Sequence, residues 1–572
     1  MYSVIEITSC LRKANAQMKL SGARILIETL IEQGTEVIFG YPGGTVLNIY
    51  DELYLNSDRI KHIITAHEQG AAHAADGYAR ASGKVGVVLA TSGPGATNLV
   101  TGIANAYLDS VPMVAITGNV AGNMFGKDSF QEVDIMGVTL PITKHNYVVR
   151  KAEDLADTVR EAFRIAMSGR PGPVLVDIPK DVQLGYAEYE KGEKVRPYET
   201  VKASDEDISK AVAMIKESKR PYIFCGGGAV ISGCESEIAE IAEKTDAYIG
   251  LSMMGLSAVH ADNQRNLGMM GMHGHYAANR ALRECDLIIA LGVRFSDRAT
   301  GNKEKFSAGK KIIHIDVDTA ELNKNIPATL CVHSELGYAV KKILVGLGDA
   351  VKRPEWAEMI EKYKYFESQH KPPFLSDKLT PYDVIDAVCR RTTDNMPVAT
   401  DVGQNQLWTA QRYRVRKPRR FLTSGGLGAM GFGMGAAIGA CVATGERTVL
   451  FTGDGGFGMN LNETMTAVSQ NLPLVVVIMN NTVLGNVRQW QTMFFNKHYS
   501  ATTLERAVNF PALAEAFGAV GLRAESREQL EEALDKAFSV NGPVVIDCAI
   551  DKDERVLPMI PPGGAFEELK LD

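Results

Sequence analysis

The amino-acid sequence predicts an α/β protein with three domains, each built on a doubly wound parallel sheet. A length of 572 residues allows three or four domains at about 150 residues each. Short apolar runs rich in valine and isoleucine recur along the chain, and amphipathic stretches of helical length separate them. This alternation is typical of strands that are buried on both faces and joined by helical crossovers.

Seven apolar runs are the expected strands. They cover residues 85–90, 111–118, 173–179, 286–292, 311–318, 448–455 and 473–481. Two polar segments that contain prolines and lack periodicity, 186–207 and 364–383, are expected to be linkers. The predicted domains are therefore residues 19–187, 205–360 and 376–550, followed by a C-terminal tail, 551–572.

Composition excludes several classes of protein. Hydrophobic residues make up 45% and charged residues 23% of the chain, which is typical of globular proteins and not of disordered ones. The net charge of −7 leaves no basic excess for binding a nucleic acid. The eight cysteines form no CxxC pair, no apolar run reaches the roughly 18 residues of a membrane helix, and the first residues lack a signal-peptide pattern. We expect a cytoplasmic protein that binds neither nucleic acid nor a membrane.

A metal site is predicted within 453-GDGGFGMNLNETMTAVSQNLPLVVVIMNN-481, which has the pattern of one βαβ unit. Asp454 ends one apolar run, and Asn481 ends the next, 27 residues later. Parallel strands lie about 4.8 Å apart, so the Asp454 carboxylate and the Asn481 amide should meet at one sheet edge. Both offer oxygen ligands that suit Mg²⁺, and the backbone carbonyl of Val483 would supply a third.

The glycines of this unit favour a diphosphate ligand. Gly453, Gly455 and Gly456 leave room for phosphate beside the backbone, and a helix expected to begin near Asn460 would point its N-terminus at the charge. The alternative is an ordinary Gly-Asp turn before a capped helix. A dinucleotide site would instead need GxGxxG directly after a strand, which 425-GGLGAMGFGMG-435 does not match cleanly.

GDG followed about 27 residues later by NN resembles the signature of thiamine diphosphate (ThDP) enzymes. The resemblance implies that Asp454 and Asn481 hold Mg²⁺ on the cofactor diphosphate. It also implies a carboxyl group that exchanges a proton with the cofactor aminopyrimidine. Glu68, at the start of the alanine-rich stretch 65–83, is the candidate; the alternative is an acidic residue that only complements a helix dipole.

A closer resemblance extends from about Gly22 to Gly564. The strings that carry it include 41-YPGG-44, 67-HEQG-70, 128-DSFQE-132, 169-GRPGPVLVDIPKD-181, 271-GMHG-274, 292-GVRFSDRATG-301, 423-TSGGLGAMGFG-433, 488-RQWQ-491 and 558-PMIP-561. They are similar to the catalytic subunit of the acetolactate synthase (acetohydroxyacid synthase) family. The resemblance implies a ThDP-binding fold for the first and third domains and a Rossmann-like central domain that holds FAD.

The same resemblance implies an activity and partners. Pyruvate would be decarboxylated on ThDP and joined to a second pyruvate or to 2-ketobutyrate, the first common step of valine, leucine and isoleucine biosynthesis. ThDP would lie between two subunits, so a homodimer or a homotetramer is expected, with a small regulatory subunit as a further partner. The alternatives are another ThDP-dependent 2-ketoacid enzyme, such as pyruvate oxidase, and a nucleotide-binding regulatory module without turnover.

Site residues follow from the resemblance position by position. Glu68 would activate the cofactor, Met430 would hold it bent, and Arg298 and Trp490 would bind the second 2-ketoacid through its carboxylate and its alkyl group. Those expected at the entrance to the reacting centre are Phe130, Gln131 and Lys180. Those expected at ThDP are Gly44, Gln404, Gly428, Met430, Gly453, Asp454, Gly455 and Gly456.

FAD has some support from the residues alone. The run 221-PYIFCGGG-228 is a strand that ends in three glycines, Gly226, Gly227 and Gly228, and Asp316 ends the run 311–316, as an acid that receives a ribose would. By resemblance, the flavin contacts also include Arg170, Met272, His273, Arg294 and Asp297. Five residues depart from those most common in the family, namely Ala121, Asn123, Asn405, Gly435 and Asn486.

Overall fold

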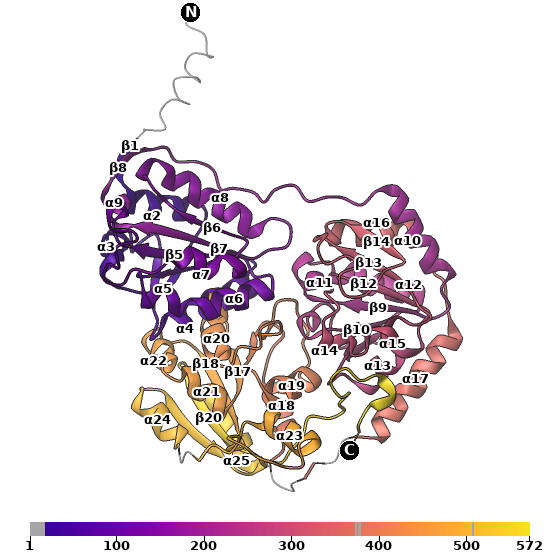
Figure 1. Cartoon of the computed structure of the whole chain (residues 1–572). Helices are drawn as coiled ribbons and strands as arrows, with labels where there is room; N and C mark the ends of the chain where they lie inside the picture. Colours follow the sequence, from indigo (N-terminus) through magenta and orange to yellow (C-terminus); the bar gives the residue numbers. More distant parts are fainter. Residues whose placement is uncertain (1–17, 372–373, 376–378, 506–507, 572) are drawn as a thin grey trace, which may run out of the picture. The chain divides into compact units, whose positions relative to one another are not determined.

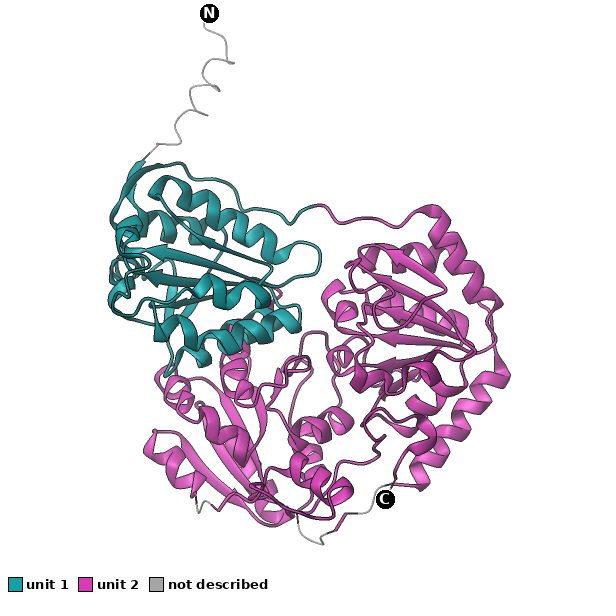
Figure 2. Ribbon diagram, viewed as in Figure 1, with its two compact units in different colours: residues 1–80, 84–198 teal, residues 81–83, 199–572 magenta. Residues whose placement is uncertain are grey.

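The computed structural model describes residues 18–371, 374–375, 379–505 and 508–571, and it contains three six-stranded parallel sheets (Figure 1). The chain separates into two compact units (Figure 2). The first unit comprises the residues up to 198 apart from 81–83, and the second comprises 81–83 and 199–572. The prediction of three parallel-sheet domains is confirmed, since the first unit holds one six-stranded parallel sheet and the second unit holds two.

The sheet of the first unit has the order β3-β2-β4-β5-β7-β6, with all neighbours parallel. Its strands are β2 (Val37–Tyr41), β3 (Lys61–Ile64), β4 (Gly86–Ala90), β5 (Met113–Asn119), β6 (His145–Val148) and β7 (Pro173–Pro179). The helices of this unit are α2 (Gly22–Glu32), α3 (Leu47–Leu55), α4 (Glu68–Ser82), α5 (Pro94–Asn98), α6 (Val100–Leu108), α7 (Ile135–Thr139), α8 (Leu155–Met167) and α9 (Lys180–Leu184). Strands β4, β5 and β7 are buried throughout, as their apolar runs predict.

A small antiparallel ribbon joins β1 (Met18–Ser21) to β8 (Tyr186–Tyr189). The expectation of a linker over 186–207 is therefore wrong for its first four residues. Ala187 and Tyr189 are buried and Tyr186 and Glu188 are exposed, a two-residue alternation that is too short to stand out in a polar segment.

The central sheet of the second unit has the order β11-β10-β9-β12-β13-β14. Its strands are β9 (Pro221–Cys225), β10 (Tyr248–Leu251), β11 (Asn266–Met269), β12 (Leu287–Leu291), β13 (Lys311–Asp316) and β14 (Leu330–His333). The helices around it are α10 (Asp205–Glu217), α11 (Gly227–Ser232), α12 (Glu235–Thr245), α13 (Tyr276–Glu284), α14 (Asp297–Thr300), α15 (Lys303–Ser307), α16 (Leu336–Leu347) and α17 (Pro354–Gln369).

The other sheet of this unit has the order β16-β15-β17-β18-β20-β19. Its strands are β15 (Val398–Thr400), β16 (Phe421–Leu422), β17 (Thr448–Gly453), β18 (Leu474–Asn480), β19 (Val520–Ala524) and β20 (Val544–Ala549). The helices are α18 (Pro381–Cys389), α19 (Gln404–Arg412), α20 (Phe432–Thr444), α21 (Asp454–Asn460), α22 (Glu463–Ser469), α23 (Gly485–Phe494), α24 (Phe510–Ala516) and α25 (Arg527–Ser539). The chain leaves β15 for the edge strand β16 and returns to β17 on the other side of β15. This reversal is a topological switch point, where open α/β sheets bind their ligands.

Two expected boundaries differ from the structure. Helix α21 begins at Asp454 and not near Asn460, because the glycine-rich stretch is itself helical. Helix α17 continues to Gln369, into the expected linker 364–383, of which 372–373 and 376–378 lie outside the described residues. The exact domain limits stay a prediction. Over the described part of the chain, no helix combines the length and the apolar character needed to cross a membrane.

The buried Arg353 side chain donates hydrogen bonds to backbone carbonyls at the C-terminal ends of two helices around the central sheet. The Arg353 side chain donates from Nε to the Ser218 carbonyl at 2.6 Å and from Nη2 to the Ile215 carbonyl at 2.7 Å. Its Nη1 donates to the carbonyls of Thr245 and Val351. These groups belong to the C-terminal ends of α10 and α12 and to the segment before α17, where helical carbonyls lack partners within their own helices.

We predict that Arg353→Lys destabilises the central sheet by about 2–4 kcal/mol, because one ammonium group cannot serve carbonyls on three elements and leaves some of them buried without a partner. Hydrogen exchange at the amides of β9 and β10 measures this loss locally. Arg220→Lys, at an exposed position beside the same sheet, is the matched control and should leave the exchange rates unchanged. Equal protection in the Arg353 variant would contradict the assigned role.

Candidate metal and cofactor site

Asp454 and Asn481 lie at the ends of two adjacent strands. Strands β17 and β18 pair in parallel with Gly453 opposite Met479, so Asp454 and the two asparagines after Met479 emerge at the same edge. The backbone N–H of Asn481 faces the Asp454 carboxylate and lowers its pKa. The predicted juxtaposition of these two residues is therefore present.

The Asp454 carboxylate is buried, with 8% of the residue exposed. Burial raises its pKa to about 6, and the negative charge of Asp547 acts in the same direction, although backbone N–H groups at Asp454, Gly455 and Asn481 oppose the shift. A cation at this carboxylate would offset the desolvation of its charge. Among the described residues, no three His, Cys, Asp or Glu side chains gather as a metal cluster. The available donors are therefore one carboxylate with amide and carbonyl oxygens, a set that fits Mg²⁺.

The Asn481 amide has a defined orientation. Its Nδ2 donates to Oε1 of Gln404 at 3.2 Å, and its Oδ1 accepts from the backbone N–H of Val483 at 3.2 Å. Because Nδ2 is occupied by Gln404, the oxygen end of the amide faces away from Gln404 and keeps a lone pair for a cation.

The three glycines predicted to border the diphosphate differ in how much space lies beside their Cα atoms. A Cβ at Gly456 would lie 2.4 Å from Oδ1 of Asp401, so close packing requires glycine there. At Gly455 it would lie 2.9 Å from a Leu484 methyl group. At Gly453 its nearest neighbour would be Nδ2 of Asn405 at 3.6 Å, an ordinary contact that leaves space beside the backbone.

The turn that carries Met430 is fixed by Asp401. Its buried carboxylate accepts the backbone N–H groups of Gly431 at 3.0 Å and Gly433 at 3.0 Å. Gly428 and Gly431 have φ values of 68° and 87°, which favour glycine. Sequence reasoning missed Asp401, because it follows the three-residue strand β15, which is too short to stand out as an apolar run.

In the first unit, most of the predicted residues follow the carboxyl ends of parallel strands. Gly44 comes after β2, Glu68 after β3 and Lys180 after β7, while Phe130 and Gln131 lie in the segment after β5. These residues therefore belong to the loops of one sheet edge. Phe130 is 87% exposed and Lys180 is exposed, and no neighbour would lie within 4 Å of a Cβ at Gly44.

Glu68 occupies the first turn of α4 and is buried, with 9% exposed. Its Oε2 accepts from Nδ2 of Asn98 at 2.9 Å, and Gly95 lies against Oε1, where a Cβ would be 3.4 Å away. Gln131 has a φ of 58° and packs against Gly93, whose Cβ would lie 2.8 Å from its own. Glu68 therefore lies against α5, and Gln131 lies against the turn that precedes it.

Arg170 lies apart from this group. Its Nε donates to the Ser110 hydroxyl at 2.8 Å, and both residues precede strands, Ser110 before β5 and Arg170 before β7. It therefore belongs to the amino edge of the sheet, opposite the edge that carries Glu68.

A cavity of about 670 Å³ in the second unit brings together residues from the central and C-terminal sheets. Its lining includes the following predicted residues: Gly226, Gly227, Met272, His273, Arg294, Asp297, Arg298, Gly428 and Trp490. Gly228 and Asp316 are not part of it. Gly228 packs against Gly292, whose Cα would lie 2.7 Å from a Cβ. The volume is in the range of cofactor sites, so the cavity fits a flavin in its predicted place.

His273 lines this cavity with an unpartnered Nδ1. Burial lowers its pKa to about 4, and the nearby Arg298 charge acts in the same direction, so its ring is neutral at physiological pH. A buried ring nitrogen without a partner is the kind of atom that a bound group completes.

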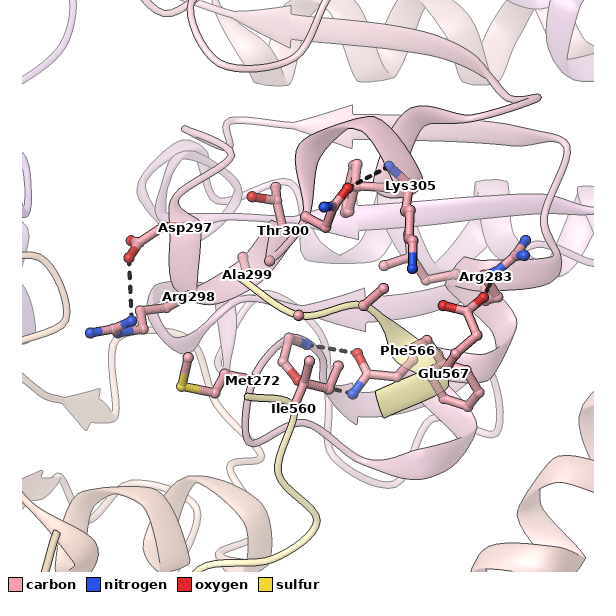
Figure 3. Close-up of a pocket in the computed structure, with 18 of the residues that line it drawn as sticks. Met272, Arg283, Asp297, Arg298, Ala299, Thr300, Lys305, Ile560, Phe566 and Glu567 are labelled. Atoms are coloured by element: carbon pink, nitrogen blue, oxygen red, sulfur yellow. Dashed lines mark hydrogen bonds and ion pairs between the residues drawn. The ribbon is translucent and has the colours of Figure 1, made fainter. Parts of the chain in front are cut away.

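Arg298 and Trp490 meet at the same cavity. The Arg298 guanidinium lies 5.7 Å from the centre of the Trp490 ring and 3.3 Å from the Asp297 carboxylate. In Figure 3 the Asp297–Arg298 pair stands at one end of a smaller pocket, away from Phe566 and Glu567 of the C-terminal segment. The cation and the aromatic ring that were predicted to bind one substrate are thus neighbours.

Comparison with known proteins agrees with this architecture. Three family models match: the N-terminal TPP binding domain of thiamine pyrophosphate enzymes over residues 20–138, the central domain over 208–343, and the C-terminal TPP binding domain over 401–548. The matches confirm the predicted ThDP-binding domains.

Similar full-length proteins come from distant organisms. The chain is 42% identical to the acetolactate synthase large subunit of Haemophilus influenzae over 97% of this chain and 98% of that protein. It is 44% identical to a probable acetolactate synthase large subunit of Methanocaldococcus jannaschii over 96% and 95% of the two chains. It is 42% identical to the Escherichia coli acetolactate synthase isozyme 1 large subunit over 97% and 98%. The chain therefore belongs to the thiamine pyrophosphate enzymes and, within them, to the family of acetolactate synthase large subunits.

Proposed function

We propose that this chain decarboxylates pyruvate and joins the remaining two-carbon unit to a second 2-ketoacid. Two pyruvates would give 2-acetolactate and CO₂, and pyruvate with 2-ketobutyrate would give 2-aceto-2-hydroxybutyrate and CO₂. This is the first common step in the biosynthesis of valine, leucine and isoleucine. The observation that carries the proposal is the pairing of Asp454 with Asn481 at adjacent strand ends in a chain of this family.

The chain's own residues would hold three cofactors. Asp454, Asn481 and the Val483 carbonyl would bind Mg²⁺, and the turns around Gly453 and Met430 would receive the diphosphate and the body of ThDP. ThDP, when bound, supplies the electron sink for decarboxylation of a 2-ketoacid. The reaction has no net redox change, so FAD in the 670 Å³ cavity would serve structure.

Glu68 would exchange a proton with N1′ of the cofactor aminopyrimidine. It sits in a buried position, and its Oε2 is oriented by Asn98. A carboxyl group that is fixed and shielded from water can hold a proton at one atom and return it during the reaction.

Arg298 and Trp490 would bind the second 2-ketoacid. The guanidinium forks onto a carboxylate, and the indole ring beside it forms a wall for the alkyl group. Phe130, Gln131 and Lys180, in loops at the Glu68 edge of the first sheet, would border the approach to the reacting centre.

The proposal extends to the partner subunit, the oligomeric state and the cellular location of the chain. The relatives are named large subunits, which supports a small regulatory subunit as a partner of this chain as well. The active unit would be a homodimer or a homotetramer, and it would act in the cytoplasm, where the free cysteines of the described residues stay reduced.

The direct test is product analysis. The purified protein with ThDP, Mg²⁺, FAD and pyruvate should release one CO₂ for each acetolactate formed. Acetaldehyde as the main product would indicate a decarboxylase, and acetate with reduction of the flavin would indicate a pyruvate oxidase; either result would overturn the proposal.

We predict that Glu68→Gln slows the exchange of the cofactor C2 proton with deuterium by 10²- to 10⁴-fold, the usual contribution of a positioned acid or base. Binding of ThDP and Mg²⁺ should persist, because Glu68 is not in the metal site. Quenched-flow proton NMR measures the exchange. Glu36→Gln, which changes an exposed carboxylate paired with Lys84 in the same unit, should exchange at the wild-type rate.

We predict that Trp490→Leu changes the preference between 2-ketobutyrate and pyruvate as second substrate by about tenfold, since one methylene in an apolar pocket contributes about 1–3 kcal/mol. The ratio of the two products from a mixture of both ketoacids measures it. Phe494→Leu removes a ring that packs on Trp490 and does not line the cavity, so it is the control. An unchanged product ratio in the Trp490 variant would rule out its role in selectivity.

A further inference from the structure

Three side-chain amides form an ordered series of hydrogen bonds that ends at the candidate metal site. Gln489 lies in α23, Gln404 at the start of α19, and Asn481 directly after β18. All three are buried, with exposed fractions of 3%, 5% and 7%. The proposed reaction gives no role to Gln489.

The orientation of the Gln489 amide is set by one backbone residue. Its Oε1 accepts from the Val556 N–H at 2.8 Å, and its Nε2 donates to the Val556 carbonyl at 3.1 Å. Because a donor and an acceptor of the same residue take the two ends of the amide, the reversed amide would place like atoms against each other. Val556, in the segment after β20, therefore fixes which way Gln489 points.

Gln489 in turn sets the orientation of Gln404. Nε2 of Gln404 donates to Oε1 of Gln489 at 3.1 Å and to the Glu554 carbonyl at 2.8 Å. With both hydrogens of Nε2 used, Oε1 of Gln404 faces the other way, toward Asn481.

Asn481 is the end of the series. Its Nδ2 donates to Oε1 of Gln404 at 3.2 Å, so Oδ1 faces away from Gln404, where it accepts from the backbone N–H of Val483 at 3.2 Å. The contact needs glycine at position 485, because a Cβ on Gly485 would lie 1.9 Å from Oε1 of Gln404 and 2.8 Å from Nδ2 of Asn481. A reversed Asn481 amide would present an NH₂ group to a cation and repel it.

We propose that Gln489 and Gln404 are positioning residues that hold Oδ1 of Asn481 toward the metal, and that they couple metal binding to the docking of the Glu554–Val556 segment. The inference rests on the proposed role of Asn481 as a metal ligand. By linkage, whatever holds this segment in place tightens metal binding, and bound metal holds the segment more firmly by the same factor.

The test measures Mn²⁺ affinity of the full-length apo protein at saturating ThDP, by electron paramagnetic resonance of the free ion. Gln489→Leu should weaken Mn²⁺ binding by about tenfold, at the low end of the 10- to 100-fold effect of outer-shell partners. Gln489→Glu keeps the acceptor for Val556 N–H and loses the donor to its carbonyl, so it should give a smaller loss. The control is Gln491→Leu, two residues away in α23. The Gln491 amide donates to the Ser500 carbonyl and accepts from the Thr502 hydroxyl, outside the series. This variant should therefore bind Mn²⁺ as the wild type does.

A double-mutant cycle separates positioning from a general loss of packing. In a Gln404→Leu background, Gln489→Leu should weaken Mn²⁺ binding by less than twofold, because the series is already broken. Additive effects would contradict the proposal. As a second readout, Mn²⁺ with ThDP should slow hydrogen exchange at the Val556 amide in the wild type and not in Gln404→Leu.

The variant Asn481→Ala separates the positioning role of Gln489 from the metal-binding role of Asn481. If Asn481→Ala lowers Mn²⁺ affinity and Gln489→Leu does not, the positioning role is wrong and the metal site stands. If Asn481→Ala itself has no effect, the proposed metal site is wrong and the inference falls with it.

Discussion

The buried contact between the Asp454 carboxylate and Asn481 is the constraint on which the rest of the site depends. Two parallel strands bring a negative charge to an edge where little water reaches it, and backbone N–H groups compensate only part of the lost hydration, so the pKa of Asp454 stays raised to about 6. A divalent cation with oxygen ligands would offset this deficit and would attract a diphosphate to the glycine-rich start of α21. The Asp454 carboxylate would therefore link the fold of this sheet to the binding of the cofactor.

Residues around Asp454 and Asn481 restrict the conformation of this sheet edge. The Asp401 carboxylate holds the turn that carries Met430 and presses against Gly456, so one side chain links the two turns on either side of the switch point. Gln404, the first residue of α19, fixes the Asn481 amide. The cavity with Arg298 and Trp490 is lined by Gly428 of the Met430 turn and by residues of the central sheet's loops. Rigid strand ends therefore position groups from loops that are distant in sequence.

Sequence reasoning reached the features that depend on local spacing. The run of apolar residues before Asp454 and Asn481 fixes two strands, and the right-handed crossover between them makes the two residues neighbours. It missed what depends on side-chain geometry across the fold, such as the contact of Gln489 with Gln404, 85 residues apart in the chain. It also misjudged the glycine-rich start of α21, because glycines that read as a turn are packed into a helix against Asp401.

A crystal structure of the protein with Mn²⁺ and ThDP is the sharpest test of the metal site, because the anomalous signal of the metal gives its position directly. We expect one peak at ligand distance, about 2.1 Å, from a carboxylate oxygen of Asp454 and from Oδ1 of Asn481, with the cofactor diphosphate on its other side. A peak coordinated by other residues, or a diphosphate bound away from residues 453–456 at the start of α21, would contradict this expectation.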